Sequence, residues 1–236
     1  MTHTGRFLLV VAVLALALAT TCSAASYQVQ IDLDPVTLTE LHESQQAILL
    51  AQQAPPGCWS TVWAAVTSPF IHNYLSWNET RGISIYASVT TLAEGRQIFM
   101  GNWRNHVDLG FLYGFHDGLF DTRQPRDWLA QNELAVFNND TGALAFGLAQ
   151  DIQVNNRWTV MPPLFACEMI GDEYEVFPSS TSFYIFIGAR TAPGTMTQNL
   201  KRVARSQMTL VTFNDSTDKV LLSWDRDSGR FIVGGF

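Results

Sequence analysis

Apolar and polar side chains alternate along most of this 236-residue chain, in short runs that turn-forming residues interrupt. In SYQVQIDL, residues 26–33, every second residue is apolar, which is typical of a strand with one buried face. Such runs predict strands over 26–33, 48–50, 59–66, 74–77, 83–88, 97–103, 105–115, 133–137, 143–149, 158–160, 174–177, 182–189, 208–213, 220–224 and 230–236. So many short strands predict an all-β fold, a mainly antiparallel β-sandwich or barrel.

One short N-terminal helix is expected over residues 35–45. Asp34 can cap its first turn, Pro35 suits the first helical position, and Leu38 and Leu41 supply an apolar face. Two loops rich in Asp, Asn and Gly, 138–142 and 225–229, are predicted to be hairpin turns. The second would join the last two strands.

The first 24 residues have the layout of a cleaved secretory signal. Arg6 gives a positive start, and an apolar run of thirteen residues from Phe7 to Ala19 is too short to span a bilayer. Small residues at Cys22 and Ala24 fit a cut after Ala24. We expect a signal peptide over 1–24 and a single secreted β-rich domain over 25–236, without a transmembrane segment in the mature chain.

Cysteine usage fits an exported protein. One of three cysteines leaves with the signal, and the remaining pair, Cys58 and Cys167, is expected to form a disulfide. Three Asn-X-Ser/Thr sequences, at Asn78, Asn139 and Asn214, are candidate glycosylation sites in that compartment.

The charge balance argues against a nucleic-acid partner. The formal net charge is −7, and removal of the signal deletes Arg6 but no acidic residue. An acidic chain lacks the basic surface that binds phosphate backbones. The basic cluster of Lys201, Arg202 and Arg205 is interpreted as a solvated face.

Residues 102–122, NWRNHVDLGFLYGFHDGLFDT, concentrate histidines and aspartates among aromatic residues. In an unbroken strand over 105–115, one face would carry the core residues Val107, Leu109, Phe111, Tyr113 and Phe115. The other face would carry His106 and Asp108. The pattern favours a solvated face, and the alternative is a catalytic site that uses His106, Asp108 and His116. We expect no metal and no cofactor.

The sequence motifs of common enzymes are incomplete. The zinc signature HExxH fails because Gln46 stands where the second histidine should follow His42. Gln52 precedes Cys58 with the spacing of papain-like proteases, but no histidine follows His116. A pair of carboxylates, as in glycosidases, leaves no local signature. Its candidates are Asp108, Asp117, Asp121, Glu133, Asp151 and Glu168.

Tryptophans are the better indication of a ligand. Trp63 and Trp224 lie within apolar alternation and are expected in the core, whereas Trp103, Trp128 and Trp158 stand among Asn, Asp and Arg side chains. An aromatic plane beside such groups can stack on a sugar ring or rest at a lipid headgroup layer. We predict ligand contacts at Trp103, Trp128, Asn155, Asn156, Arg157 and Trp158. The alternative is that these rings fold back over the core.

The sequence thus predicts a secreted, disulfide-bonded β-sandwich that binds a carbohydrate or another cell-surface or membrane ligand, as a lectin, toxin or effector does. The alternative is a small secreted hydrolase that uses carboxylates or a His/Asp pair. Whether the chain is an enzyme, and its oligomeric state, stay open at this level.

Overall fold

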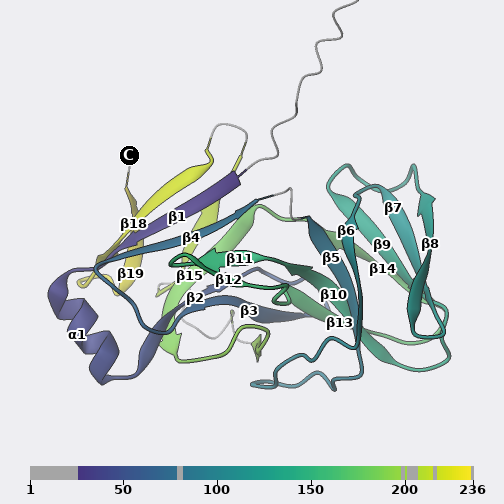
Figure 1. Cartoon of the computed structure of the whole chain (residues 1–236), viewed down its shortest axis with the longest axis horizontal. Coiled ribbons are helices and arrows are strands. Elements are labelled where there is room, and N and C mark those ends of the chain that lie inside the picture. The colour runs from purple at the N-terminus through teal and green to yellow at the C-terminus, as the bar shows by residue number, and fades with distance from the viewer. Residues whose placement is uncertain (1–25, 79–81, 198–199, 201–206, 215–216, 235–236) are drawn as a thin grey trace, which may run out of the picture.

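The structure, a computed structural model, describes residues 26–236 except 79–81, 198–199, 201–206, 215–216 and 235–236. The expected signal peptide and the basic cluster around Lys201 lie outside these described residues. Within them the chain forms nineteen strands in three sheets and one helix, α1 (Pro35–Glu43), shown in Figure 1. The described residues include no helix long and apolar enough to cross a membrane.

The strands are distributed over a large sheet and two smaller ones. The nine-stranded sheet has the order β17 (Thr209–Thr212), β15 (Ser182–Ala189), β2 (Gln46–Ala51), β3 (Trp59–Val66), β13 (Phe165–Met169), β10 (Leu144–Gln150), β5 (Ile83–Ser88) and β6 (Asn102–Val107), with β16 (Met196–Thr197) beside β3. The six-stranded sheet has the order β12 (Arg157–Thr159), β11 (Ile152–Val154), β4 (His72–Asn78), β1 (Ser26–Asp32), β18 (Lys219–Asp225) and β19 (Arg230–Gly234). The four-stranded sheet has the order β14 (Glu173–Pro178), β9 (Glu133–Asn138), β7 (Phe111–His116) and β8 (Leu119–Pro125).

Most neighbouring strands are antiparallel, and the parallel pairs among the named strands are β1 with β18 and β7 with β9. The short helix follows β1 as expected: the Asp34 carboxylate accepts hydrogen bonds from the N–H groups of Val36 and Thr37, at 2.9 and 3.0 Å. The β18–β19 hairpin closes at residues 225–229, also as predicted. The prediction of a mainly antiparallel, sandwich-like all-β fold with one N-terminal helix is confirmed.

A single apolar cluster lies between the large sheet and the two smaller ones. On the side of the six-stranded sheet, Trp63 of β3 stacks on Phe183 at 4.8 Å and meets Trp77 of β4 edge-on at 5.0 Å. On the side of the four-stranded sheet, Phe115 of β7 meets Phe146 of β10 at 5.2 Å. All five side chains belong to one buried cluster, so the two smaller sheets cover the same face of the large sheet, side by side (Figure 1).

The strand predicted over 105–115 is wrong in one respect. The chain turns at residues 108–110, where Gly110 has a φ of +81°, so β6 ends at Val107 and β7 starts at Phe111. The Tyr113 hydroxyl holds this turn by accepting from the Asp108 N–H and donating to the Asp108 carbonyl. The alternation runs through the turn without a break, which concealed it. Val107, Tyr113 and Phe115 are nevertheless buried as predicted, whereas Leu109 and Phe111 are only partly buried against the core.

Two further local predictions are corrected. Residues 138–142 do not close a hairpin, because β9 belongs to the four-stranded sheet and β10 to the nine-stranded sheet. The loop therefore crosses between sheets. The strand expected over 97–103 begins only at Asn102, and Gln97 makes an isolated bridge to Thr195.

The predicted disulfide is present. Cys58 and Cys167 are bonded, and they join the start of β3 to β13 across 109 positions of sequence. Cys167 lies in the main core, and Cys58 packs against it. The bridge thus links two neighbouring strands in the middle of the large sheet.

Candidate functional site

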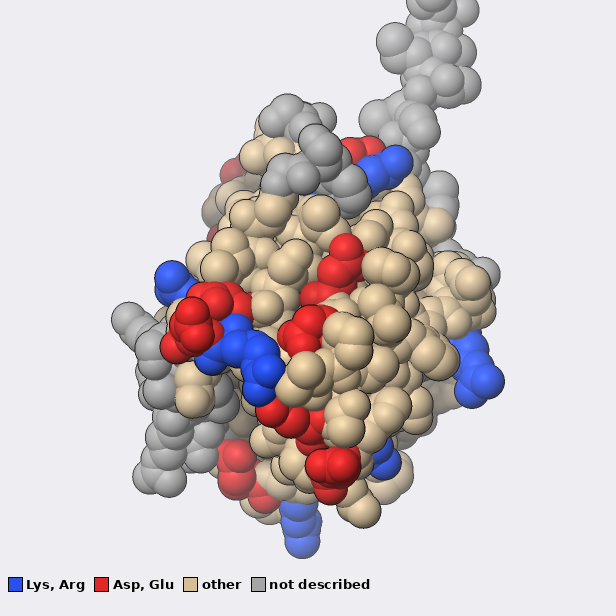
Figure 2. Space-filling model, turned by 90° about the vertical axis from the view of Figure 1, so that its left-hand side faces the viewer, with Lys and Arg blue, Asp and Glu red and all other residues tan. Residues whose placement is uncertain are grey.

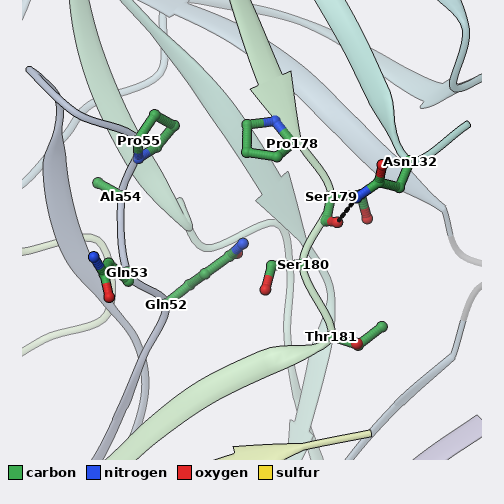
Figure 3. Close-up of a pocket in the computed structure, with 9 residues that line it drawn as sticks. All are labelled: Gln52, Gln53, Ala54, Pro55, Asn132, Pro178, Ser179, Ser180 and Thr181. Carbon is green, nitrogen blue, oxygen red and sulfur yellow. Dashed lines mark hydrogen bonds between the residues drawn. The ribbon is translucent and has the colours of Figure 1, made fainter. Parts of the chain in front are cut away.

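A cavity of about 400 Å³ opens where segments from the large and the four-stranded sheets meet (Figure 3). One wall is the stretch that follows β2, and the other is the connection from β14 to β15, with Asn132 before β9 beside it. The lining residues are Gln52, Gln53, Ala54, Pro55, Asn132, Pro178, Ser179, Ser180 and Thr181.

Hydrogen bonds hold both walls in place. The Ser179 N–H donates to the Asn132 carbonyl at 2.7 Å, and the Asn132 side-chain amide donates to the Ser179 carbonyl at 3.4 Å, the bond that Figure 3 draws. On the opposite wall the Ala54 N–H donates to the Ser60 hydroxyl at 3.0 Å. The Cys58 N–H donates to the Pro55 carbonyl at 3.1 Å, which ties this wall to the disulfide. The cavity is therefore a preformed feature.

Gln52 is the unusual residue of this cavity. It is only 2 % exposed, and its Oε1 atom has no hydrogen-bond partner among the described residues. Figure 3 shows its side chain reaching from the β2 wall into the space between the two walls. Nearly all buried polar atoms in folded proteins are paired, since an unpaired one costs the free energy of its lost hydration. The Gln52 oxygen is thus a buried acceptor beside the cavity whose hydrogen-bonding capacity is unmet among the described residues.

The chemistry of the lining is neutral and rich in hydrogen-bonding groups. Amides, hydroxyls and prolines make up most of it, and the described residues that line it include no carboxylate, imidazole, thiol, Lys or Arg. Such groups can donate to and accept from hydroxyls, but they cannot transfer a proton at neutral pH or balance an ionic charge. The cavity is suited to binding an uncharged polar molecule.

A second cavity, of about 250 Å³, shares the lining segment Ser179–Thr181 with the first. Its lining is more apolar and comes from the six-stranded sheet and the large sheet, with Tyr27, Trp77, Ile83, Val107 and Leu109 among its residues. The shared segment therefore borders both cavities, whose linings together come from all three sheets.

The predicted catalytic candidates are not brought together. His106 and Asp108 precede β7, whereas His116 is its last residue, and five residue steps of strand span about 17 Å. Asp108 forms an ion pair with Arg123 of β8. His106 and Asp108 are exposed, and neither lines a cavity described above.

His116 lies instead beside Asp117 and Asp140. Its Nε2 is 3.4 Å from an Asp117 oxygen, and its Nδ1 is 3.5 Å from an Asp140 oxygen. Ligand atoms of the three residues lie within 4.8 Å of one another, a spacing that a cation could use. The Asp140 carboxylate already accepts from the N–H groups of Asp117 and Gly118, in the β7–β8 turn where both residues have positive φ. The group is therefore explained by its support of the turn.

The carboxylates considered for a hydrolase are dispersed. The Glu133 side chain accepts from the Ala130 N–H at 3.0 Å, and the Asp151 side chain accepts from the Met161 N–H at 2.8 Å. None of the six candidates lines either cavity: Asp108, Asp117, Asp121, Glu133, Asp151 and Glu168. Cys58 is not available as a nucleophile, because its sulfur is bonded to Cys167.

The three predicted ligand-binding tryptophans lie in three different places. Trp103 is on β6 of the large sheet, Trp158 is on β12 at the edge of the six-stranded sheet, and Trp128 is in the loop between β8 and β9. All three are exposed. They do not share a sheet, so they do not build one common aromatic face.

Asn155 and Asn156 form the turn between β11 and β12, where both have positive φ. The Asn155 side chain accepts from the Tyr74 N–H at 2.8 Å and donates to Asn73 Oδ1 at 3.1 Å, which fixes the hairpin to β4. This is a structural role that the sequence did not suggest. Arg157, the next residue, is exposed.

Of the candidate glycosylation sites, Asn139 and Asn214 are exposed and Asn78 is half-buried at the end of β4. The third residues of two of these sequons, Thr80 and Ser216, lie outside the described residues.

The described surface at the α1 end carries charges of both signs. Figure 2 shows acidic and basic side chains side by side there, without an extended basic area on that face. One such pair is Arg226 with Glu40, at 2.6 Å.

The sequence alone did not identify the cavity that Gln52 lines. Gln52 was considered only for its spacing from Cys58, and no sequence pattern indicated a site at Asn132 or at Ser179–Thr181. Comparisons with protein-family models, curated proteins and solved structures found no match to this chain.

Proposed function

We propose that this protein is a secreted binding protein for an uncharged carbohydrate, which it holds in the cavity that Gln52 enters. The carrying observation is the buried, unpartnered Gln52 oxygen in a lining of amides and hydroxyls. A sugar hydroxyl can donate the hydrogen bond that this oxygen lacks, and the lone pairs of the sugar oxygens can accept from amide and hydroxyl donors on the walls.

Export is the second element of the proposal. It rests on the signal-like segment 1–24 and is supported by the Cys58–Cys167 disulfide, a bond that persists in oxidising compartments. Mass analysis of the protein secreted by its source cells should find a first residue near Ala25. Secreted material that still begins at Met1 would refute this element.

The hydrolase alternative receives less support. Glycoside hydrolysis requires two carboxyl groups across the bond that breaks, and the lining of the Gln52 cavity offers none. A binding function requires only hydrogen-bonding groups of the kind that the lining contains.

The test is a glycan array followed by titration calorimetry, with the disulfide-bonded protein. We expect binding to one class of uncharged glycans, and about a tenfold weaker affinity in Gln52→Met, which keeps the size of the side chain but removes the acceptor. Gln28→Met is the matched control, because Gln28 lies on β1 and lines neither cavity. The proposal fails if uncharged glycans do not bind, or if Gln52→Met binds them as the native protein does.

A further inference from the structure

Two exposed aromatic rings pack against each other near the Gln52 cavity. Trp128 and Tyr174 have ring centroids 5.7 Å apart and planes inclined by 59°. Their residues are 54 % and 61 % exposed, so each keeps much of its surface in water. Trp128 was predicted from the sequence as a ligand contact, whereas Tyr174 was not.

The strand β14 connects this pair to the cavity. Tyr174 stands at its start and Pro178, which lines the cavity, at its end. Residues four apart on a strand point to the same side, and they are about 13 Å apart. Phe177 points the other way and is buried in the core, so Tyr174 and Pro178 share the outward face.

The loop that carries Trp128 leads to the same cavity. It joins β8 to β9, and its residue Asn132 forms the wall bonds with Ser179. Both partners of the aromatic pair thus belong to segments that also line the cavity. A chain molecule that leaves the cavity along β14 would reach the two rings.

The chemistry around the pair favours sugar over other extended ligands. The sequence neighbours of Tyr174 on β14, Glu173 and Glu175, are acidic, so this strand offers no cation that would hold the phosphates of nucleic acids or of anionic lipids. Exposed Trp and Tyr rings offer a flat apolar surface with a polar edge, which can contact a sugar ring on its apolar face.

We infer that the ligand is an oligosaccharide chain of uncharged sugars, with one end in the Gln52 cavity and a later sugar stacked on the Trp128–Tyr174 pair. This inference rests on the proposed function and specifies its ligand class. A cavity of about 400 Å³ lies at the small end of the usual range for ligand sites, in accord with its holding one end of a longer molecule.

The experiment is calorimetric titration of glucose, mannose and N-acetylglucosamine, and of their linear tetrasaccharides, against the native protein and four variants. We expect one tetrasaccharide to bind more tightly than its monosaccharide. Trp128→Ala or Tyr174→Ala should weaken the tetrasaccharide about tenfold and leave the monosaccharide unchanged. Gln52→Met should weaken both. Phe99→Ala is the control, because Phe99 is an exposed aromatic residue, at 71 %, that lines neither cavity.

The outcomes separate the two proposals. If the monosaccharide binds but the tetrasaccharide gains nothing, or if Trp128→Ala and Tyr174→Ala leave its affinity unchanged, the chain inference is overturned and the carbohydrate site stands. If none of the six sugars binds the native protein and the glycan array is also negative, the proposed function itself fails. Thermal melts of each variant confirm that the fold is intact.

Discussion

Replacing Gln52 by methionine should stabilise the protein while it weakens ligand binding. The Gln52 oxygen is buried without a hydrogen-bond partner among the described residues. An unsatisfied buried polar group costs about 1–3 kcal/mol relative to a paired one. Methionine has similar length and no polar oxygen, so the substitution removes that cost and keeps the packing. We expect the free energy of unfolding to rise by about 1–2 kcal/mol.

The assay is urea unfolding of the ligand-free, disulfide-bonded protein, with thermal melting in parallel. For a protein of this size, 1 kcal/mol corresponds to a melting-temperature change of about 2–4 °C. The control Gln28→Met should change stability by less than about 0.5 kcal/mol, since Gln28 is on the partly exposed side of β1. The reasoning is refuted if Gln52→Met destabilises the protein, because its oxygen would then form a bond worth keeping. Opposite signs for stability and binding are the signature of a residue retained for function.

Three other predictions concern the scaffold. Reduction of the Cys58–Cys167 bond, which spans 109 positions, should lower the free energy of unfolding by about 4–5 kcal/mol in the chain-entropy model, and urea unfolding with and without reductant measures this. Phe115→Ala should lower the free energy of unfolding by about 3–5 kcal/mol, because Phe115 is buried against two other rings. Phe111 is only half-buried, so Phe111→Ala should lower it by less. Equal losses in the two variants would contradict this difference in burial. Burial alone would raise the pKa of Asp32, but hydrogen bonds from His72 and Gln30 and the His72 charge outweigh it and lower the pKa. A carboxyl with a lowered folded-state pKa stabilises the fold above its unfolded pKa and loses that contribution as the pH falls. Stability should therefore decrease below about pH 4, and Asp32→Asn should flatten part of that decrease in acid-unfolding curves.

Local pattern determined much of this fold. The predicted strands 59–66 and 83–88 match β3 and β5 at both ends, because apolar alternation and flanking turn residues depend on neighbours in the sequence. The cap at Asp34 likewise acts within one helical turn. The disulfide was predictable because only Cys58 and Cys167 lie outside the expected signal segment, which leaves one pairing.

Tertiary structure decided the rest, where the outcome depends on residues far apart in the chain. The alternation gave no sign of the turn at residues 108–110, which is fixed by the Gly110 backbone and by hydrogen bonds with the Tyr113 hydroxyl. The candidate site is the clearest case of a feature that depends on residues far apart in the chain. Gln52 and Ser179 are separated by more than a hundred positions. They meet because β15, which follows Ser179, pairs with β2, which precedes Gln52, and because β14 of the four-stranded sheet packs into the same place. A glutamine in a sequence is an ordinary polar residue, and only this packing buries its oxygen and leaves it unpaired.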